Sequence, residues 1–162
     1  APSRIEGHVQ KFGDHVDTDA IIPGEFCHLS NIEEIGRRAF HHVRPEFPRL
    51  VREGRSIVVA GHGWGSGSSR EHAAWALKGA GVRLVIARSF AFIHKRNLVN
   101  EAIPFLVLDD AEFRQAVQEG SLLEADLTTG EVRIAGIDKT FQAQPPAGIS
   151  REIQTAGGLV PS

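Results

Sequence analysis

The chain is almost without cysteine: Cys27 is the only one in 162 residues. A single cysteine excludes an internal disulfide framework and is compatible with a reducing cytoplasm. It also excludes an iron–sulfur cluster or a cysteine-rich zinc site held by this chain alone. We therefore expect a cytoplasmic protein whose own residues bind no metal.

Excess charge and long apolar runs are missing as well. The formal net charge is −2, and Lys and Arg form no long run, so nucleic acid or an anionic membrane surface is not the expected partner. No apolar stretch approaches the ~20 residues that cross a bilayer, and the N-terminus has no secretory pattern. The length predicts one domain over residues 1–162, able to bury roughly 70% of its unfolded surface.

Strand-like and helix-like segments alternate through the centre of the chain, which predicts an α/β fold. Apolar strand patterns cover residues 4–12, 56–60, 82–87 and 104–108. Helical patterns cover residues 30–40, 73–78, part of 89–100, 111–120 and 148–156. Residues 122–141 predict a β-hairpin that turns at 128–130, and Pro45 and Pro48 predict an irregular segment.

The most informative segment is a glycine-rich loop at residues 61–72, between a strand pattern and a helix pattern. Its glycines can adopt positive φ and let the backbone approach a ligand closely. Two serines and an arginine follow where the helix is expected to begin. Free N–H groups and the positive end of the helix dipole favour anions there. The loop therefore predicts an oxyanion site.

Motif spacing argues against three other interpretations of this loop. The dinucleotide fingerprint, the P-loop and the Gly-x-Ser-x-Gly nucleophile elbow all fail to match. Ser68 and Glu71 have the spacing of a capping box, a role that can coexist with anion binding. His62 and His72 are a possible metal pair but are better explained as polar or surface histidines. Cys27 is better explained as a small buried residue than as a nucleophile.

Four segments, taken in order, resemble the aconitase and isopropylmalate isomerase family. The sequence Gly-Ser-Gly-Ser-Ser-Arg-Glu-His-Ala-Ala at 65–74 resembles the family's Gly-x-Gly-Ser-Ser-Arg-Glu-His-Ala signature. Residues 17–24 are similar to its Asp-Thr-Asp-x-Ile-x-Pro-Gly segment, residues 87–98 to its Ser-Phe-Ala-x-Ile segment, and residues 153–159 to its ending. The resemblance covers almost the whole chain and is to the small subunit. It implies a single swivelling-type domain with three layers, β/β/α.

The resemblance also implies a partner and a reaction. In this family a separate large subunit carries three cysteines that hold a [4Fe–4S] cluster, and the two subunits form a heterodimer or a heterotetramer. The small subunit holds no cofactor and is inactive alone. The implied activity is that of a hydro-lyase, which removes water from a small hydroxy-carboxylic acid and adds it back at the neighbouring carbon.

Site residues follow from the matched motifs. Ser68 aligns with the serine proposed as the base, and Ser69 and Arg70 align with ligands of the substrate carboxylate. Thr18 and Asp19 align with a second active-site segment that binds the substrate or orients a neighbour. Dehydration beside a carboxylate needs a base for a weakly acidic C–H bond and groups that stabilise the anion formed. A helix N-terminus, glycine-loop amides and an arginine can supply that stabilisation.

The stretch Phe26, Cys27, His28 and Leu29 aligns with the family's substrate-specificity loop. Three of these residues are apolar, which favours an isopropyl group and hence 3-isopropylmalate of leucine biosynthesis. Homoaconitase, a methylmalate- or dimethylmalate-type dehydratase and a detached aconitase domain remain alternatives in the same class. The alternative from another class is a carboxylate-binding module without catalysis.

Overall fold

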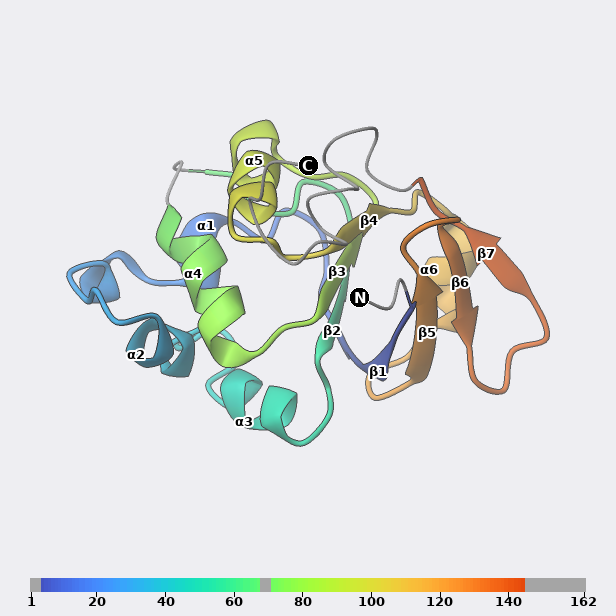
Figure 1. Ribbon diagram of the computed structural model, residues 1–162, viewed down its shortest axis with the longest axis horizontal. Coiled ribbons are helices and arrows are strands. Elements are labelled where there is room, and N and C mark those ends of the chain that lie inside the picture. The colour runs from blue at the N-terminus through green and yellow to red at the C-terminus, as the bar shows by residue number, and fades with distance from the viewer. Residues whose placement is uncertain (1–3, 68–70, 145–162) are drawn as a thin grey trace.

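The computed structural model describes residues 4–67 and 71–144, which form one seven-stranded mixed sheet (Figure 1). The strand order is β4-β3-β2-β1-β5-β6-β7. The first four strands run parallel, and β5 to β7 run antiparallel to their neighbours. Their bounds are β1 (Arg4–Lys11), β2 (Ile57–Ala60), β3 (Leu84–Ala87), β4 (Phe105–Val107), β5 (Leu122–Asp126), β6 (Glu131–Ile134) and β7 (Thr140–Gln142).

The helices divide between the two halves of the sheet. Five α-helices gather beside the parallel strands, and α6 lies by the antiparallel strands (Figure 1). Their bounds are α1 (Thr18–Ile21), the 3₁₀ helix η1 (Gly24–Phe26), α2 (Ile32–Arg37), α3 (Phe47–Arg52), α4 (Glu71–Ala80), α5 (Phe92–Asn100) and α6 (Ala111–Ala116).

Alternation along the parallel strands builds two cores. In β2, Val58 and Ala60 face the helices, whereas Ile57 and Val59 face the other side. The second core also contains residues of β5, β6 and β7, so the curled sheet lays its antiparallel half against the back of its parallel half. The layers are therefore helices, parallel strands and antiparallel strands, which confirms the predicted α/β fold.

Most predicted elements are present with shorter bounds. The strand patterns at 4–12, 56–60, 82–87 and 104–108 correspond to β1 to β4, and the helix pattern at 30–40 corresponds to α2. Asn31 caps α2, because its side chain accepts a hydrogen bond from the amide of Glu34 at 3.1 Å. The predicted helix at 148–156 lies outside the described residues.

Three predictions were wrong in detail. Pro45 and Pro48 do not leave the segment irregular, because Pro48 lies in the first turn of α3, where a missing N–H costs nothing. The helix predicted over 111–120 ends at Ala116, and residues 117–121 turn the chain into β5. Residues 122–141 form more than a hairpin, because β7 adds a third antiparallel strand on β6.

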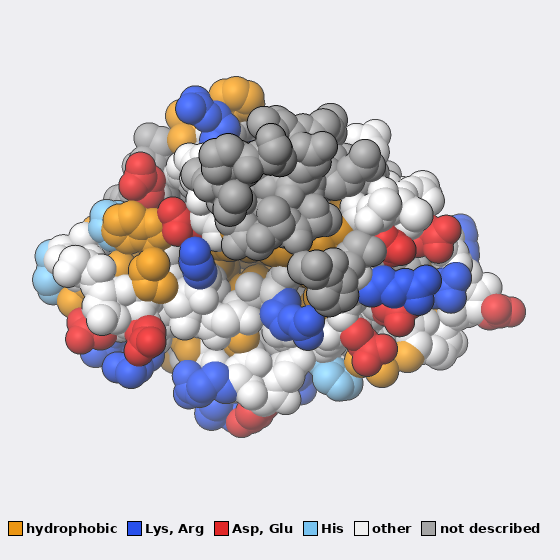
Figure 2. Space-filling view, viewed as in Figure 1, with side chains coloured by type: hydrophobic (Ala, Val, Ile, Leu, Met, Phe, Trp, Pro, Cys, Tyr) orange, Lys and Arg blue, Asp and Glu red, His pale blue; other side chains and the backbone are white. Residues whose placement is uncertain are grey.

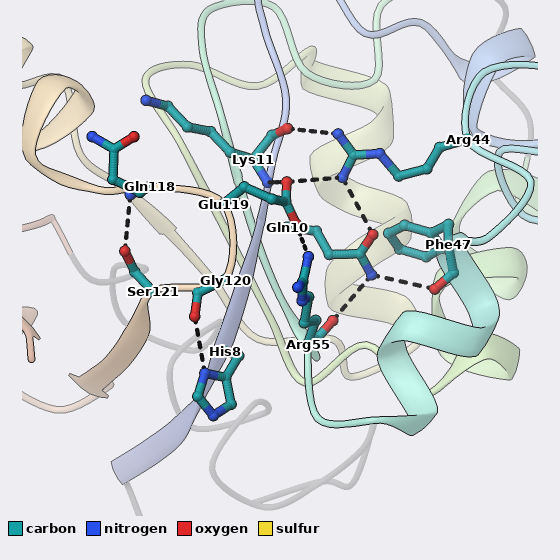
Figure 3. Close-up of polar contacts among 10 residues, drawn as sticks. All are labelled: His8, Gln10, Lys11, Arg44, Phe47, Arg55, Gln118, Glu119, Gly120 and Ser121. Atoms are coloured by element: carbon teal, nitrogen blue, oxygen red, sulfur yellow. Dashed lines mark hydrogen bonds and ion pairs between the residues drawn. The ribbon is translucent and has the colours of Figure 1, made fainter.

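A polar network joins the two halves of the molecule around β1 (Figure 3). The side chain of Gln10, fully buried, donates to the carbonyls of Phe47 at 3.2 Å and Arg55 at 3.1 Å. Glu119, which precedes β5, pairs with Arg55 at 2.9 Å and with Arg44 at 3.3 Å. These contacts tie α3 and the segment before β5 to the same strand.

The surface in view mixes charges of both signs, as the balanced composition leads one to expect (Figure 2). Within residues 4–67 and 71–144, no helix combines the length and the apolar character that crossing a membrane requires.

Candidate active site

The glycine loop begins directly after β2 and is hydrogen-bonded along its length to the segment that follows β1. Gly61 donates to the carbonyl of Gly13 at 3.0 Å, and Gly65 donates to the carbonyl of Val16 at 2.7 Å. The amide of His62 donates to the Asp14 carboxylate at 2.8 Å. This side of the loop is therefore an extension of the β1–β2 pairing.

The other side of the loop is bonded to the segment that follows β3. Trp64 donates to the carbonyl of Ser89 at 3.1 Å, and Ala91 donates to the carbonyl of Trp64 at 2.9 Å. The hydroxyl of Ser89 accepts from the amide of Gly63 at 2.9 Å and lies 3.1 Å from the Nδ1 atom of His62. Residues 61–66 thus form a fixed ridge between two neighbouring segments.

Close packing explains why glycine is needed in this ridge. A Cβ atom at Gly61 would lie 1.8 Å from a carboxylate oxygen of Asp14. Gly65 has a φ of +81°, and a Cβ atom there would lie 2.3 Å from the ring of His94. Any side chain at Gly65 would therefore meet both backbone strain and a clash.

The last described residues before the gap, Ser66 and Gly67, lie beside the predicted second segment of the site. The amide of Thr18 donates to the carbonyl of Ser66 at 2.8 Å, and Asp17 and Ser66 form an isolated parallel bridge. A Cβ atom at Gly67 would be 3.6 Å from the hydroxyl oxygen of Thr18. The structure therefore brings Thr18 next to the end of the glycine loop, although the two segments are almost fifty residues apart.

Thr18 and Asp19 differ in exposure. Thr18 is buried and begins α1, which Asp17 caps by accepting from the amide of Ala20 at 2.7 Å. Asp19 is exposed, and its carboxylate accepts from the amide of Gly24 at 3.3 Å. Asp19 thus orients the start of η1, which leads into the predicted specificity loop.

Ser68, Ser69 and Arg70 lie outside the described residues, and so does the predicted capping contact of Ser68. The structure describes the residues on either side of them. Gly67 precedes them beside Thr18, and Glu71 begins α4, which is ten residues long. Their assigned roles stay predictions.

The predicted specificity loop is packed on its apolar side and exposed at one residue. Phe26, Cys27 and Leu29 are half-buried against the helix-side core, whereas His28 is exposed. The Nδ1 atom of His28 lies 2.9 Å from the carbonyl oxygen of Glu25. The carboxylate of Glu25 also contacts the ring of His42, which anchors the segment to the chain after α2.

The carboxylate of Asp14, which holds the ridge, is stabilised in its charged form. The amide hydrogen bond from His62 lowers the pKa of Asp14 most, desolvation opposes this, and the nearby charges of His62, His15 and Arg114 lower the pKa further. His62 contacts Ser89, and the ring centroid of His72 lies 4.7 Å from that of Trp75. Within residues 4–67 and 71–144 no cluster of three or more His, Cys, Asp or Glu side chains is arranged to hold a metal ion.

Sequence reasoning assigned no role to Asp14, Ser89 or His94, which hold the ridge in place. Ser89 and His94 fall within a segment that matches a family motif, and that is the signal that could have found them. Asp14 has no such signal, because its contact with His62 spans 48 residues and depends on strand register.

Comparison with known proteins agrees with this geometry. The model of the aconitase C-terminal domain family matches residues 5–111. A 3-isopropylmalate dehydratase small subunit of Halothermothrix orenii is 42% identical over 97% of this chain and 93% of its own length. A methanogen homoaconitase small subunit of Methanocaldococcus jannaschii is 40% identical over 96% of this chain and 89% of its own length.

A solved structure is similar as well. The crystal structure of 3-isopropylmalate dehydratase from Methanocaldococcus jannaschii has a TM-score of 0.88 and 39% sequence identity. The match covers 96% of this chain and 90% of that one. The family model matches about two thirds of the chain, and the relatives and the solved structure match nearly its whole length. The chain therefore belongs to the aconitase C-terminal domain family.

Proposed function

We propose that the chain is the small subunit of a 3-isopropylmalate dehydratase-type hydro-lyase. Such an enzyme interconverts 2-isopropylmalate and 3-isopropylmalate by removing water and adding it back. The near-full-length similarity to a small subunit of that name supports this function. The observation that carries it is the glycine ridge fixed beside Thr18, which leads into the sequence Ser68-Ser69-Arg70.

The proposed chemistry assigns one role to each of these residues. Ser68, as its alkoxide, accepts the proton from the carbon next to a carboxylate, and the C–H electron pair becomes the C=C bond as hydroxide leaves. The cluster on the large subunit would supply the Lewis acid that takes up this hydroxide. Ser69 and Arg70 bind the substrate carboxylate, since a guanidinium can pair with it through two parallel hydrogen bonds. The N-terminal end of α4 favours the negative charge that develops there.

Thr18 and Asp19 complete the site on the second segment. Thr18 adjoins Gly67, and we assign its hydroxyl to bind or orient the substrate. Asp19 holds the amide of Gly24 and so links the site to the specificity loop. His28 is the exposed residue of that loop, and we assign it to contact the substrate group that is apolar in some acids and charged in others.

The iron–sulfur cluster of this enzyme class does not fit the residues of this chain. Cys27 is the only cysteine, and its thiol lies 3.9 Å from the carbonyl of Pro23. We therefore assign the [4Fe–4S] cluster to a separate large subunit, in a heterodimer or heterotetramer located in the cytoplasm. The name "small subunit" of the relatives supports the existence of such a partner.

The test is reconstitution with a cluster-bearing large subunit and assay of isopropylmaleate hydration. Ser68→Ala is expected to lower kcat on the order of 10²–10⁴-fold, as loss of a general base does. Ser66→Ala is the matched control, because Ser66 contacts Thr18 through its backbone carbonyl, and its kcat should stay within about threefold of wild type. Near-wild-type activity of Ser68→Ala would exclude Ser68 as the base.

A substrate panel on the same complex decides among the alternatives. Preference for isopropylmaleate over homoaconitate, methylmaleate, dimethylmaleate and aconitate supports the proposal. Preference for homoaconitate would favour the homoaconitase alternative, which the similarity to a methanogen homoaconitase small subunit keeps open. Tight carboxylate binding by the isolated chain, with no turnover in any complex, would favour the non-catalytic binding module.

A further inference from the structure

His94 has an unusual environment for an ionisable residue. It belongs to the first turns of α5 and is only 2% exposed. Within the part of the chain that the structure describes, neither ring nitrogen has a hydrogen-bond partner. Burying polar atoms without partners costs free energy, because their hydrogen bonds to water are lost. Since neither nitrogen is bonded to a described residue, the ring of His94 contributes at this position through its shape and packing.

The ring of His94 lies directly against the glycine ridge. A Cβ atom at Gly65 would be 2.3 Å from Cγ, 2.4 Å from Cδ2 and 2.5 Å from Cβ of His94. These are carbon atoms, so the ring supports Gly65 by its shape rather than through a hydrogen bond. Because Gly65 is also bonded to the carbonyl of Val16, it is held on two sides.

The position of Gly65 affects the site through its neighbour Ser66. Ser66 follows Gly65, and its carbonyl accepts the hydrogen bond from the amide of Thr18 at 2.8 Å. We propose that His94 is a positioning residue of the active site, whose ring sets the position of the glycine ridge relative to Thr18. The kinetic test of this inference rests on the proposed function, whereas the hydrogen-exchange test does not.

The kinetic test uses the reconstituted complex and three single variants. His94→Ala removes the ring and is expected to lower kcat on the order of 10-fold to 100-fold, as misplacing a catalytic group does. His94→Phe keeps a flat ring and should retain kcat within about threefold. Leu98→Ala is the matched control, because Leu98 is fully buried one turn further along α5. It should lower Tm and leave kcat within about threefold.

A double-variant cycle tests the contact itself. Gly65→Ala should lower kcat because its new Cβ atom meets the ring of His94. In a His94→Gly background, which removes the Cβ atom as well as the ring, that clash is relieved, so Gly65→Ala should cost at least fivefold less in kcat. Additive effects of the two substitutions would overturn the proposal. So would equal kcat losses in His94→Ala and Leu98→Ala, or a His94→Phe variant as impaired as His94→Ala.

Hydrogen exchange provides a readout that does not depend on activity or on the partner. The amide of Thr18 should exchange at least tenfold faster in His94→Ala than in Leu98→Ala, because its bond to Ser66 is loosened. Equal exchange rates would overturn the proposal. If the wild-type complex proves inactive on every hydroxy acid, the proposed function fails, and the exchange result still decides the role of His94.

Discussion

At the residue scale, the candidate site depends on a few side chains that hold backbone rather than substrate. Asp14 accepts from the amide of His62, Ser89 accepts from the amide of Gly63, and His94 packs on Gly65. Each contact joins segments that are distant in sequence. The residues proposed to bind the substrate therefore depend on a frame built by residues to which the proposal gives no chemical role.

The titration of His94 makes stability depend on pH. Burial lowers the pKa of His94 from its ordinary value of 6.5 to about 4. The unfolded chain therefore binds this proton between pH 6.5 and 4 while the folded chain does not, so stability falls as the pH is lowered through that window. The full loss for a shift of this size is about 3 kcal/mol.

Urea unfolding at pH 7.5 and at pH 4.5 measures this effect. His94→Phe removes the titrating group, so its unfolding free energy relative to wild type should rise by about 2–3 kcal/mol between the two pH values. His28→Gln is the control, since His28 is exposed, and its difference from wild type should change by less than 0.5 kcal/mol. A constant difference for His94→Phe would show that His94 does not titrate in this window.

At the element scale, α2 and α4 cross with their backbones in contact. A Cβ atom at Gly79 of α4 would lie 2.0 Å from the carbonyl oxygen of Ile32, and one at Gly36 of α2 would lie 2.2 Å from the carbonyl carbon of Gly79. Small residues on both helices permit this approach. The crossing fixes α4, whose N-terminal end follows the glycine ridge.

Gly79→Ala is expected to destabilise the protein although alanine is the better helix former. The new methyl group must push α2 and α4 apart, which should cost more than about 2 kcal/mol against a propensity gain of about 1 kcal/mol. Gly13→Ala is the matched control, because a Cβ atom there meets nothing within 4 Å. Thermal unfolding of both variants measures the effect, and equal Tm values would contradict close packing at this crossing.

The sequence predicted elements better than their contacts. Strands β2 and β3 were found because their buried apolar runs are continuous, and α2 because Asn31 offers a cap. Local patterns do not predict helix α3, because proline usually ends a helix, although it is tolerated in a first turn. Thr18 was found through a motif, whereas its contact with Ser66 depends on strand register and packing, which local patterns do not contain.

At the scale of the whole molecule, two cores share one sheet. The same strands, β2 and β3, contribute Val58 and Val85 to one core and Ile57 and Leu84 to the other. The network around Gln10 and Glu119 adds polar contacts across the boundary. Loss of either the parallel or the antiparallel strands would expose the second core, because both sets of strands line it.

We therefore expect a single cooperative unfolding transition. Fluorescence of Trp64, which is fully buried in the helix-side core, should report the same denaturation midpoint as far-UV circular dichroism of the whole chain. The calorimetric and van't Hoff enthalpies should agree for the same reason. An early fluorescence change that leaves β5 to β7 folded would show two independent units instead.

The anchoring of the specificity loop has an evolutionary consequence. Residues 24–29 are attached to the chain after α2, through Glu25 and His42, while the glycine ridge is attached to the segments after β1 and β3. Asp19, next to Thr18, accepts a hydrogen bond from the amide of Gly24 and so connects the two parts. Under the proposed function, substitutions at His28 would change which acid is accepted without moving the glycine ridge, so that one ancestral scaffold would diversify into several substrate preferences.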